Sequence, residues 1–230
     1  MSNLAVIIGR KGSKRIKNKN FKNFHGKMVI EWSLDTAEKT NLFDEIIIST
    51  DKKKKNIQNR KINKFIKFER PKKFSNDYSS THDAVIHSIE WFIKKFYKPD
   101  YVCCLYACSP LIDYKNLIKA YKKIKSNQWN FVTSATKYQY PIERSFTINI
   151  DKSIKMNQPR NYHKRTQMFV DSYHDAGQFY WGKVNSWLNK KKFFDSNSTI
   201  QEIESSRVLD IDNMDDWKKA ELIFSNITNE

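Results

Sequence analysis

The stretch LAVIIGRKGSKRIKNKN, residues 4–20, decides the fold. Its first part, residues 4–8, is a continuous apolar run, which predicts a strand buried on both faces as in a parallel sheet. Residues 10–20 then hold six Lys or Arg and one Gly. Two interpretations follow from these residues alone: a nucleic-acid-binding tail, or a loop that holds a phosphorylated small molecule.

Apolar runs and helix-like segments alternate along most of the chain. We predict buried strands at 4–8, 45–50, 64–68, 101–107 and 131–136, and helices at 28–40, 52–61, 81–96 and around Leu117, Tyr121 and Ile124. This alternation predicts an α/β fold, an open and mostly parallel twisted sheet with helices on both faces. We expect one domain over residues 1–230.

The alternation breaks over residues 137–174, which are polar and include FTINIDKSIKM, a predicted hairpin that turns at Asp151-Lys152. We interpret this stretch as an inserted arm. Regular structure is predicted to return with AGQFYWG (176–182), a strand-like RVLDID (207–212) and a final helix at 214–225.

The chain is strongly basic, with a formal net charge of +17 at pH 7 and a pI near 9.6. A nucleic-acid-binding domain concentrates such charge on one face or tail. Here Lys is spread over predicted helices and loops alike, so the charge alone decides little about function.

Several features favour a cytoplasmic protein without a membrane segment. No run of 18 apolar residues is present, and a membrane-spanning helix needs about that length. MSNLAVIIG at the N-terminus lacks the basic region and cleavage site of a signal peptide. Cys103, Cys104 and Cys108 are clustered and odd in number, which is typical of reduced thiols rather than of a disulfide framework.

Polar clusters follow the predicted strands: GRKGSKR after the first, STD after the second and YACSP after the third. Ligands bind beyond the carboxyl ends of strands in such sheets, which favours an enzyme. In the basic loop, Gly12 permits close backbone approach to phosphate, Ser13 offers a hydroxyl, and Arg10, Lys14 and Lys19 supply charge. The spacing matches no nucleotide-binding fingerprint, so a solvated basic loop stays the alternative.

The pattern R-x-G-S-K-R-I-x-x-K-N resembles the N-terminal signature of the CMP-sialic acid synthetase family, the acylneuraminate cytidylyltransferases. The likeness continues through GKMVIEWSLDTA, FDEIIISTD, ERPKKFSND, YVCCLYACSPLI and DIDNMDDWKKAE, and so covers the whole chain. It implies a Rossmann-like nucleotidyltransferase fold of the GT-A type, in which the arm serves dimerisation.

Two stretches are similar to the pseudaminic acid branch of that family. They are the Tyr106-Ala107 start of the Ser-Pro turn, and YHDAGQFYWG at 173–182. Two positions depart from the family pattern: Lys11 stands where Gly is usual, and Lys52 where an acidic residue often follows. Gly9 is expected to restore the backbone freedom that Lys11 removes.

The resemblance implies transfer of CMP from CTP to a nonulosonic acid, with release of pyrophosphate, for surface glycan or flagellin glycosylation. It implies catalytic roles for Arg10, Lys14, Lys19, Asp210 and Asp212. Nucleotide binding is implied for Arg10, Gly12, Ser13, Lys14, Lys19, Asn20, Arg70 and Thr81. Arg165, as a partner of the sugar carboxylate, and Tyr106, His174, Asp175 and Gln178 are expected to bind the sugar. For Arg70 a surface arginine, and for His174 a structural histidine, are the alternatives.

Asp210 and Asp212 are one residue apart in LDID, so on a strand both carboxylates point to one side. Such a pair suits Mg²⁺, which takes few carboxylates plus phosphate oxygens. The alternative is that Asp212 caps the last helix, with Asp215 and Asp216 in its first turn.

Other functions stay open on the sequence. Within the family they are synthesis of CMP-N-acetylneuraminate, CMP-legionaminate or CMP-Kdo. The alternative from another class is a basic nucleic-acid-binding protein with a decayed transferase site. The intact basic loop and the DID motif argue against this alternative. We therefore expect CTP, the sugar acid and a second copy of the chain as partners.

Overall fold

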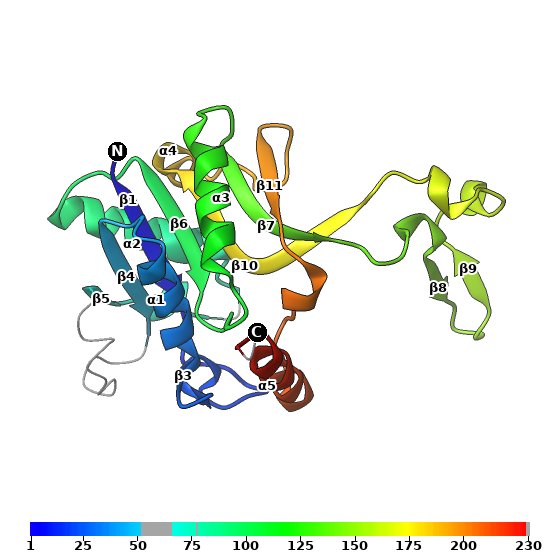
Figure 1. Ribbon diagram of the computed structural model, residues 1–230, viewed down its shortest axis with the longest axis horizontal. Coiled ribbons are helices and arrows are strands. Elements are labelled where there is room, and N and C mark those ends of the chain that lie inside the picture. The colour runs from blue at the N-terminus through cyan, green and yellow to red at the C-terminus, as the bar shows by residue number, and fades with distance from the viewer. Residues whose placement is uncertain (52–65, 77, 229–230) are drawn as a thin grey trace.

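A seven-stranded sheet forms the centre of the molecule in the computed structural model, which describes residues 1–51, 66–76 and 78–228 (Figure 1). Its strands are β1 (Asn3–Ile8), β4 (Glu45–Thr50), β5 (Ile66–Glu69), β6 (Tyr101–Tyr106), β7 (Phe131–Lys137), β10 (Tyr173–Lys183) and β11 (Ser198–Glu202). Their order across the sheet is β11-β7-β10-β6-β1-β4-β5. Six of them run parallel, and β10 runs antiparallel to its neighbours β6 and β7.

Helices cover both faces because the strands alternate their apolar side chains between the faces. On one face Ala5 and Ile7 of β1 pack with α1 (Val29–Lys39) and α3 (Tyr114–Lys125). On the other, Leu4 and Val6 pack with α2 (Thr81–Lys95) and α4 (Val184–Leu188). The last helix, α5 (Met214–Thr228), packs on a third cluster around Phe24, next to the hairpin of β2 (Asn23–Phe24) and β3 (Lys27–Met28). The mostly parallel α/β sheet is therefore as predicted.

Short 3₁₀ turns connect several of these elements. They are η1 (Lys19–Phe21), η4 (Lys72–Phe74), η5 (Ile142–Arg144), η6 (Pro159–Asn161), η7 (Thr166–Met168) and η8 (Ser205–Arg207).

The predicted strand at 207–212 is wrong. Residues 208–212 have no regular structure, and the sheet edge beside β7 is taken by β11, which the sequence analysis did not predict. The alternating apolar residues are nevertheless used: Ile211 is buried against the α5 cluster, while Val208 packs on the α1–α3 side. The predicted helix at 52–61 lies outside the described residues.

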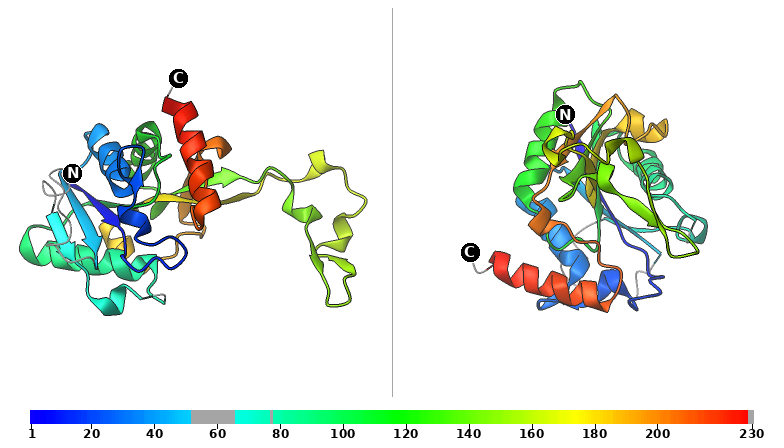
Figure 2. Two further views of the ribbon diagram at one scale, coloured as in Figure 1. Left: turned by 90° about the horizontal axis from the view of Figure 1, so that it is seen from below. Right: turned by 90° about the vertical axis from the view of Figure 1, so that its right-hand side faces the viewer.

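The predicted arm leaves the sheet between β7 and β10 and extends away from it (Figure 1, Figure 2). It ends in a hairpin of β8 (Phe146–Ile148) and β9 (Ile154–Met156), as predicted. Lys152 has a φ of 67° in the turn, where the Asp151 carboxylate accepts the Ser153 N–H. At the base, the Tyr138 N–H donates to Ser172 O at 2.9 Å.

The arm is less polar at its surface than the sequence suggested. Most of the exposed large apolar side chains in the described part of the chain belong to it, namely Tyr138, Tyr140, Ile142, Phe146, Ile148, Ile150, Ile154, Tyr162, Met168, Val170 and Tyr173. The side chain of Ile150, at the hairpin tip, has no neighbour that covers it.

Candidate active site

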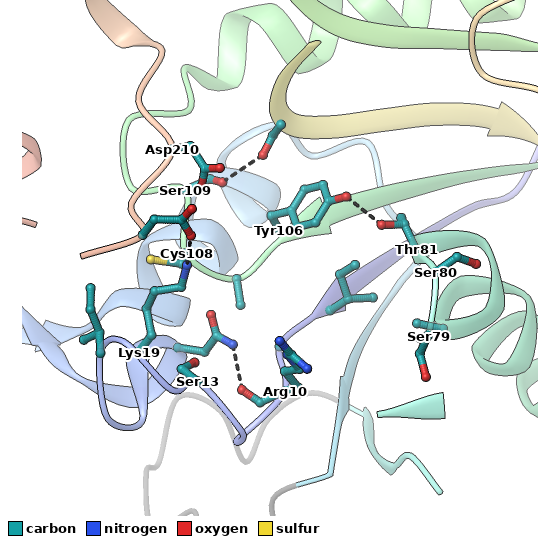
Figure 3. Close-up of a pocket in the computed structure, with 18 of the residues that line it drawn as sticks. Arg10, Ser13, Lys19, Ser79, Ser80, Thr81, Tyr106, Cys108, Ser109 and Asp210 are labelled. Atoms are coloured by element: carbon teal, nitrogen blue, oxygen red, sulfur yellow. Dashed lines mark hydrogen bonds and ion pairs between the residues drawn. The ribbon is translucent and has the colours of Figure 1, made fainter. Parts of the chain in front are cut away.

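A pocket of about 930 Å³ opens at the carboxyl edge of the parallel strands (Figure 3). Its wall combines the loop after β1, the segment from β5 to the start of α2, the turn after β6, the first residues of β10 and the 208–212 loop. The predicted residues that line it are Arg10, Ser13, Lys14, Lys19, Asn20, Arg70, Thr81, Tyr106, His174, Asp175, Asp210 and Asp212. The sheet topology thus brings together residues that are up to two hundred positions apart.

The basic loop after β1 is held in place by contacts at its base. The Gly9 N–H donates to Ser49 O at 3.0 Å, and the Asn20 side-chain amide donates to Arg10 O at 2.8 Å. The Lys11 N–H donates to the Asp51 carboxylate at 2.6 Å. Lys11, where the resemblance led us to expect Gly, therefore has its backbone anchored by the residue that follows β4.

The two glycines of this loop differ from expectation. Gly12 is exposed, lies outside the pocket wall, and has nothing within 4 Å of the position a Cβ would take. Gly9 is a packing position, since its φ is not in the left-handed region and a Cβ there would lie 2.8 Å from the Ala107 Cβ. The expectation that Gly9 restores backbone freedom is therefore wrong.

Arg70 follows β5 and is 5% exposed, so the alternative of a surface arginine is wrong. Its Nε donates to Ser75 Oγ at 3.0 Å. Burial lowers the pKa of Arg70, while Asp51 opposes that shift. The guanidinium nevertheless stays charged at neutral pH, because free Arg titrates far above it. Arg70 therefore brings a buried cation to the pocket wall.

The start of α2 forms the wall beside Arg70. Ser80 caps the helix: its Oγ accepts the Asp83 N–H at 3.1 Å, and the Asp83 carboxylate reaches back to the Ser80 N–H. This capping box satisfies N–H groups that a helix start leaves free. It fixes Thr81, the first helical residue, with its Oγ1 at 2.6 Å from the Tyr106 hydroxyl (Figure 3).

Asp210 and Asp212 lie at the basic end of the pocket. The Asp212 carboxylate is 2.8 Å from Arg15 Nη2 and 3.8 Å from Lys19 Nζ. Lys19 Nζ also donates to Ile211 O at 2.5 Å. Partial withdrawal from water and the neighbouring Asp212 charge raise the pKa of Asp210. Two carboxylates that repel each other here would be stabilised by a cation.

The helix cap of α5 is Asn213, not Asp212. Asn213 Oδ1 accepts the N–H groups of Asp215 and Asp216 at 2.9 and 3.0 Å. In return, the Asp216 carboxylate accepts the N–H groups of Asp212 and Asn213. The Asp212 side chain is thus left to Arg15, Lys19 and the pocket, and the capping alternative is wrong.

The donor set fits Mg²⁺ when phosphate oxygens complete it. Over the described ranges, no group of three or more His, Cys, Asp or Glu side chains could hold a metal ion by itself. Two carboxylates beside a phosphate-binding loop are what Mg²⁺ commonly uses, because this ion keeps water and substrate phosphates among its ligands.

The predicted sugar-binding residues divide into two groups. Tyr106, His174 and Asp175 line the pocket, whereas Gln178 and Arg165 lie outside its wall. Gln178 is buried in β10, where its Nε2 donates to Arg207 O at 2.6 Å and so holds the turn before the acidic loop. Arg165 is an exposed residue of the arm, at the start of η7. Neither side chain is brought to the pocket of its own chain.

His174 has contacts that also suit a structural histidine. Its Nδ1 is 3.0 Å from Asp175 O, and its ring lies against Tyr138 at the base of the arm. Both the ligand and the structural interpretation of His174 are compatible with this position.

Further residues that line the pocket were not predicted, among them Arg15, Cys108, Ser109 and Tyr180. Arg15 belongs to the basic motif and pairs with Asp212. Burial raises the pKa of the Cys108 thiol to about 12, against the effect of Lys19, so it stays protonated in the wall. Cys103, Cys104 and Cys108 are free thiols, as predicted.

No helix in the described residues is both long and apolar enough to cross a membrane.

Comparisons with known proteins identify the family of the chain. A family model described as cytidylyltransferase matches residues 4–223. The pseudaminic acid cytidylyltransferase of Campylobacter jejuni subsp. jejuni is 38% identical over 225 residues, which cover 97% of each chain. The N-acylneuraminate cytidylyltransferase of Escherichia coli is 23% identical over 94% of this chain and 51% of its own.

Solved structures share the fold. A CMP:2-keto-3-deoxy-manno-octonic acid synthetase complexed with CTP superposes with a TM-score of 0.68 at 13% identity, covering 99% of this chain and 100% of that one. The 4-diphosphocytidyl-2C-methyl-D-erythritol synthase of Anaerococcus prevotii gives 0.63 at 14% identity, over 97% and 99%. With the family match over nearly its whole length, the chain belongs to the cytidylyltransferase family.

Proposed function

We propose that the chain transfers CMP from CTP to pseudaminic acid and releases pyrophosphate. The observation that carries this proposal is the pocket itself, where the cations of the β1 loop face Asp210 and Asp212. The identity to pseudaminic acid cytidylyltransferases, 38% over 97% of both chains, supports the choice of sugar acid. One cytidylyltransferase domain spans residues 1–230, with 137–174 as its arm.

In the proposed reaction, the anomeric hydroxyl of the sugar attacks the α-phosphorus of CTP as the bond to pyrophosphate breaks. Such a transfer depends on positioning and on neutralising phosphate charge. Arg10, Ser13 and Lys14 bind the triphosphate, and Lys19 stabilises the leaving pyrophosphate. Asp210 and Asp212 would hold Mg²⁺, which when bound would further neutralise the phosphate charge.

Lys19 and Arg15 both have partners on the acidic loop. Lys19 Nζ is bonded to Ile211 O, and Arg15 pairs with Asp212. A bound triphosphate would compete with these partners for Lys19 and Arg15. A bound metal ion would compete with Arg15 for the Asp212 carboxylate. The nucleoside is held by Asn20, Arg70 and Thr81.

We further propose that the arm pairs two copies of the chain. A surface with this much exposed apolar side chain on an extended hairpin is typical of a contact site. Pairing also gives Arg165 a function, because it lies outside the pocket of its own chain. It would then bind the sugar carboxylate from the arm of the partner copy.

The dimer is tested by light scattering at micromolar concentration. The wild type should have the mass of two chains, and Ile148→Lys with Ile150→Lys should have the mass of one. Leu222→Lys on α5, another exposed apolar residue away from the arm, is the matched control and should stay dimeric. A monomeric wild type would contradict the proposal.

The activity is tested by pyrophosphate release from CTP with Mg²⁺ and purified pseudaminic, N-acetylneuraminic, legionaminic or 3-deoxy-manno-octulosonic acid. We expect turnover with pseudaminic acid and far less with the others. Preference for another acid would correct the substrate. Release with none of them, together with tight and salt-dependent binding to DNA or RNA, would favour the nucleic-acid alternative. The free cysteines suit the reducing cytoplasm, where we place the enzyme.

A further inference from the structure

Gln178 is a buried polar side chain that lies outside the pocket. It belongs to β10 and is 4% exposed. Its Nε2 donates to Arg207 O at 2.6 Å, and this is the one hydrogen bond that the side chain makes within the described part of the chain. A buried amide is costly unless it is hydrogen-bonded, so an apolar side chain would fill this space at lower cost. The position therefore favours a role for the bond to Arg207 O itself.

A bulge in β10 directs the Gln178 side chain to that bond. The register of β10 against β7 shifts between Asp175 and Tyr180. Within the shift, Ser134 Oγ of β7 accepts the Gln178 N–H at 3.2 Å, so the displaced backbone stays bonded to its neighbour. A bulge changes the direction in which nearby side chains point. As a result Asp175 and Tyr180 line the pocket, whereas Gln178 reaches Arg207 O.

Arg207 O is an anchor at the start of the 208–212 loop. Arg207 is the last residue of η8, and the loop that follows it carries Asp210 and Asp212. A second bond holds the same turn, since Arg207 Nη1 donates to Leu111 O at 3.4 Å. The entry to the loop is therefore tied to β10 and to the turn after β6. Neither bond uses a group that binds substrate in the proposed reaction.

The far end of the 208–212 loop is held by cations for which a bound triphosphate would compete. Lys19 Nζ donates to Ile211 O at 2.5 Å, and Arg15 Nη2 is 2.8 Å from the Asp212 carboxylate. Ile211 is 1% exposed, and its burial fixes the middle of the loop. The bond from Gln178 joins two neutral groups outside the pocket, so it persists when phosphate draws the two cations away. It then fixes the direction from which the loop enters the site.

We infer that Gln178 is a positioning residue for the proposed Mg²⁺ site: its bond to Arg207 O sets where the 208–212 loop begins, and thereby where Asp210 and Asp212 lie when the triphosphate is bound. The inference rests on the proposed function, in that these two carboxylates are taken as Mg²⁺ ligands and CTP as the nucleotide. Bonds that hold metal ligands in place commonly change metal affinity by about tenfold or more. Gln178 itself touches neither the metal nor the nucleotide.

Calorimetry of CTP binding with and without Mg²⁺ tests this inference. No sugar acid is added, so no transfer takes place during the measurement. The ratio of the two dissociation constants measures the coupling between metal and nucleotide. We expect the wild type to bind CTP more tightly when Mg²⁺ is present.

Gln178→Met is the decisive variant, because it fills a similar volume and removes the donor to Arg207 O. The matched control is Gln201→Met. Gln201, on β11, is a 7% exposed glutamine outside the pocket wall, and its Nε2 also donates to a backbone oxygen, that of Glu202, at 2.9 Å. Gln178→Asn is a second variant, whose amide is one methylene shorter and falls short of Arg207 O. It serves if the methionine variant does not fold.

In Gln178→Met the gain in CTP affinity from Mg²⁺ should fall about tenfold, the low end of the range for groups that hold metal ligands in place. CTP affinity without Mg²⁺ should be unchanged. Gln178→Asn should behave in the same way, and Gln201→Met should behave as the wild type. General damage to the pocket would weaken CTP binding under both conditions. In a turnover assay, Gln178→Met should need more Mg²⁺ for half-maximal pyrophosphate release and should recover kcat at saturating Mg²⁺.

The inference and the proposed function fail differently. The inference would be overturned by a wild type whose CTP affinity does not respond to Mg²⁺. It would also be overturned if the Gln178 variants keep the wild-type gain, or if they lose CTP affinity equally with and without Mg²⁺. A gain that is present in the wild type and lost in Gln178→Met, without pyrophosphate release from any of the sugar acids, would refute the proposed function and leave the inference standing.

Discussion

Replacing Gly9 by Ala tests whether the floor of the pocket is set by close packing. The added Cβ would lie 2.8 Å from the Ala107 Cβ and 3.4 Å from the Asn20 Cβ. Neither neighbour is the flexible end of a side chain. Ala107 is held by its own N–H, which donates to Ile8 O at 3.1 Å, and Gly9 is held by Ser49 O. The strands must therefore separate locally, or the basic loop must move.

The expected cost is that of overpacking a well-packed core, about 1–3 kcal/mol of unfolding free energy. For a chain of this size, each kcal/mol lowers Tm by about 2–4 °C. CTP affinity should fall as well, because Arg10 is the next residue. Adding Ala107→Gly removes the opposing methyl group, so the double variant should recover stability with a coupling of about 0.5–3 kcal/mol.

Urea denaturation of the wild type, both single variants and the double variant measures this coupling. Gly12→Ala is the matched control, since nothing lies within 4 Å of its Cβ position and its φ is not in the left-handed region. It should leave the denaturation midpoint nearly unchanged. Additive effects of Gly9→Ala and Ala107→Gly, or equal destabilisation by Gly12→Ala, would refute the packing argument.

Three further outcomes are expected. Asn213→Ala should cost about 1 kcal/mol of unfolding free energy through the lost cap, while turnover persists. Asp212→Asn should abolish most turnover at limiting Mg²⁺ with little change in Tm. The opposite pattern would assign the helix cap to Asp212. Arg10→Ala should lower kcat/KM for CTP by a factor that corresponds to about 1.5–3 kcal/mol, the range for a charge-assisted hydrogen bond. Unchanged kinetics would show that the basic loop is solvated and does not bind the triphosphate. Burial lowers the pKa of His82 and His87 below 6.5. As pH falls below that value, the unfolded chain therefore binds protons before the folded one, and the free energy of unfolding drops. The urea midpoint of the wild type should fall from pH 7 to 5, and that of the double variant His82→Gln with His87→Gln should fall less.

The buried strands were predictable because both of their faces are covered. LAVII (4–8) and III (46–48) are continuous apolar runs, and β1 and β4 contain them. β11, STIQE, lies at the sheet edge, and its mixed residues carry no such signal. An edge strand is recognised by its partner, which a single sequence does not provide.

The site residues were predictable where they follow strand ends and not where a strand is irregular. Gln178 and Tyr180 both belong to YHDAGQFYWG, but the bulge at 175–180 changes which side chains face the pocket. Asp212 and Asn213 are adjacent candidates for one cap, and only the hydrogen bonds separate them. That Arg165 lies outside the pocket of its own chain depends on where the arm extends, which the sequence does not show.

The position of β10 has a consequence for synthesis on the ribosome. This strand lies between β6 and β7, yet it comes later in the chain than either, after the whole arm. A nascent chain that ends before residue 173 therefore presents two unpaired strand edges toward the same empty slot, and exposed edges of this kind promote aggregation. The arm's own hairpin pairs locally and closes part of the intervening loop, which shortens the search that brings β10 into the slot.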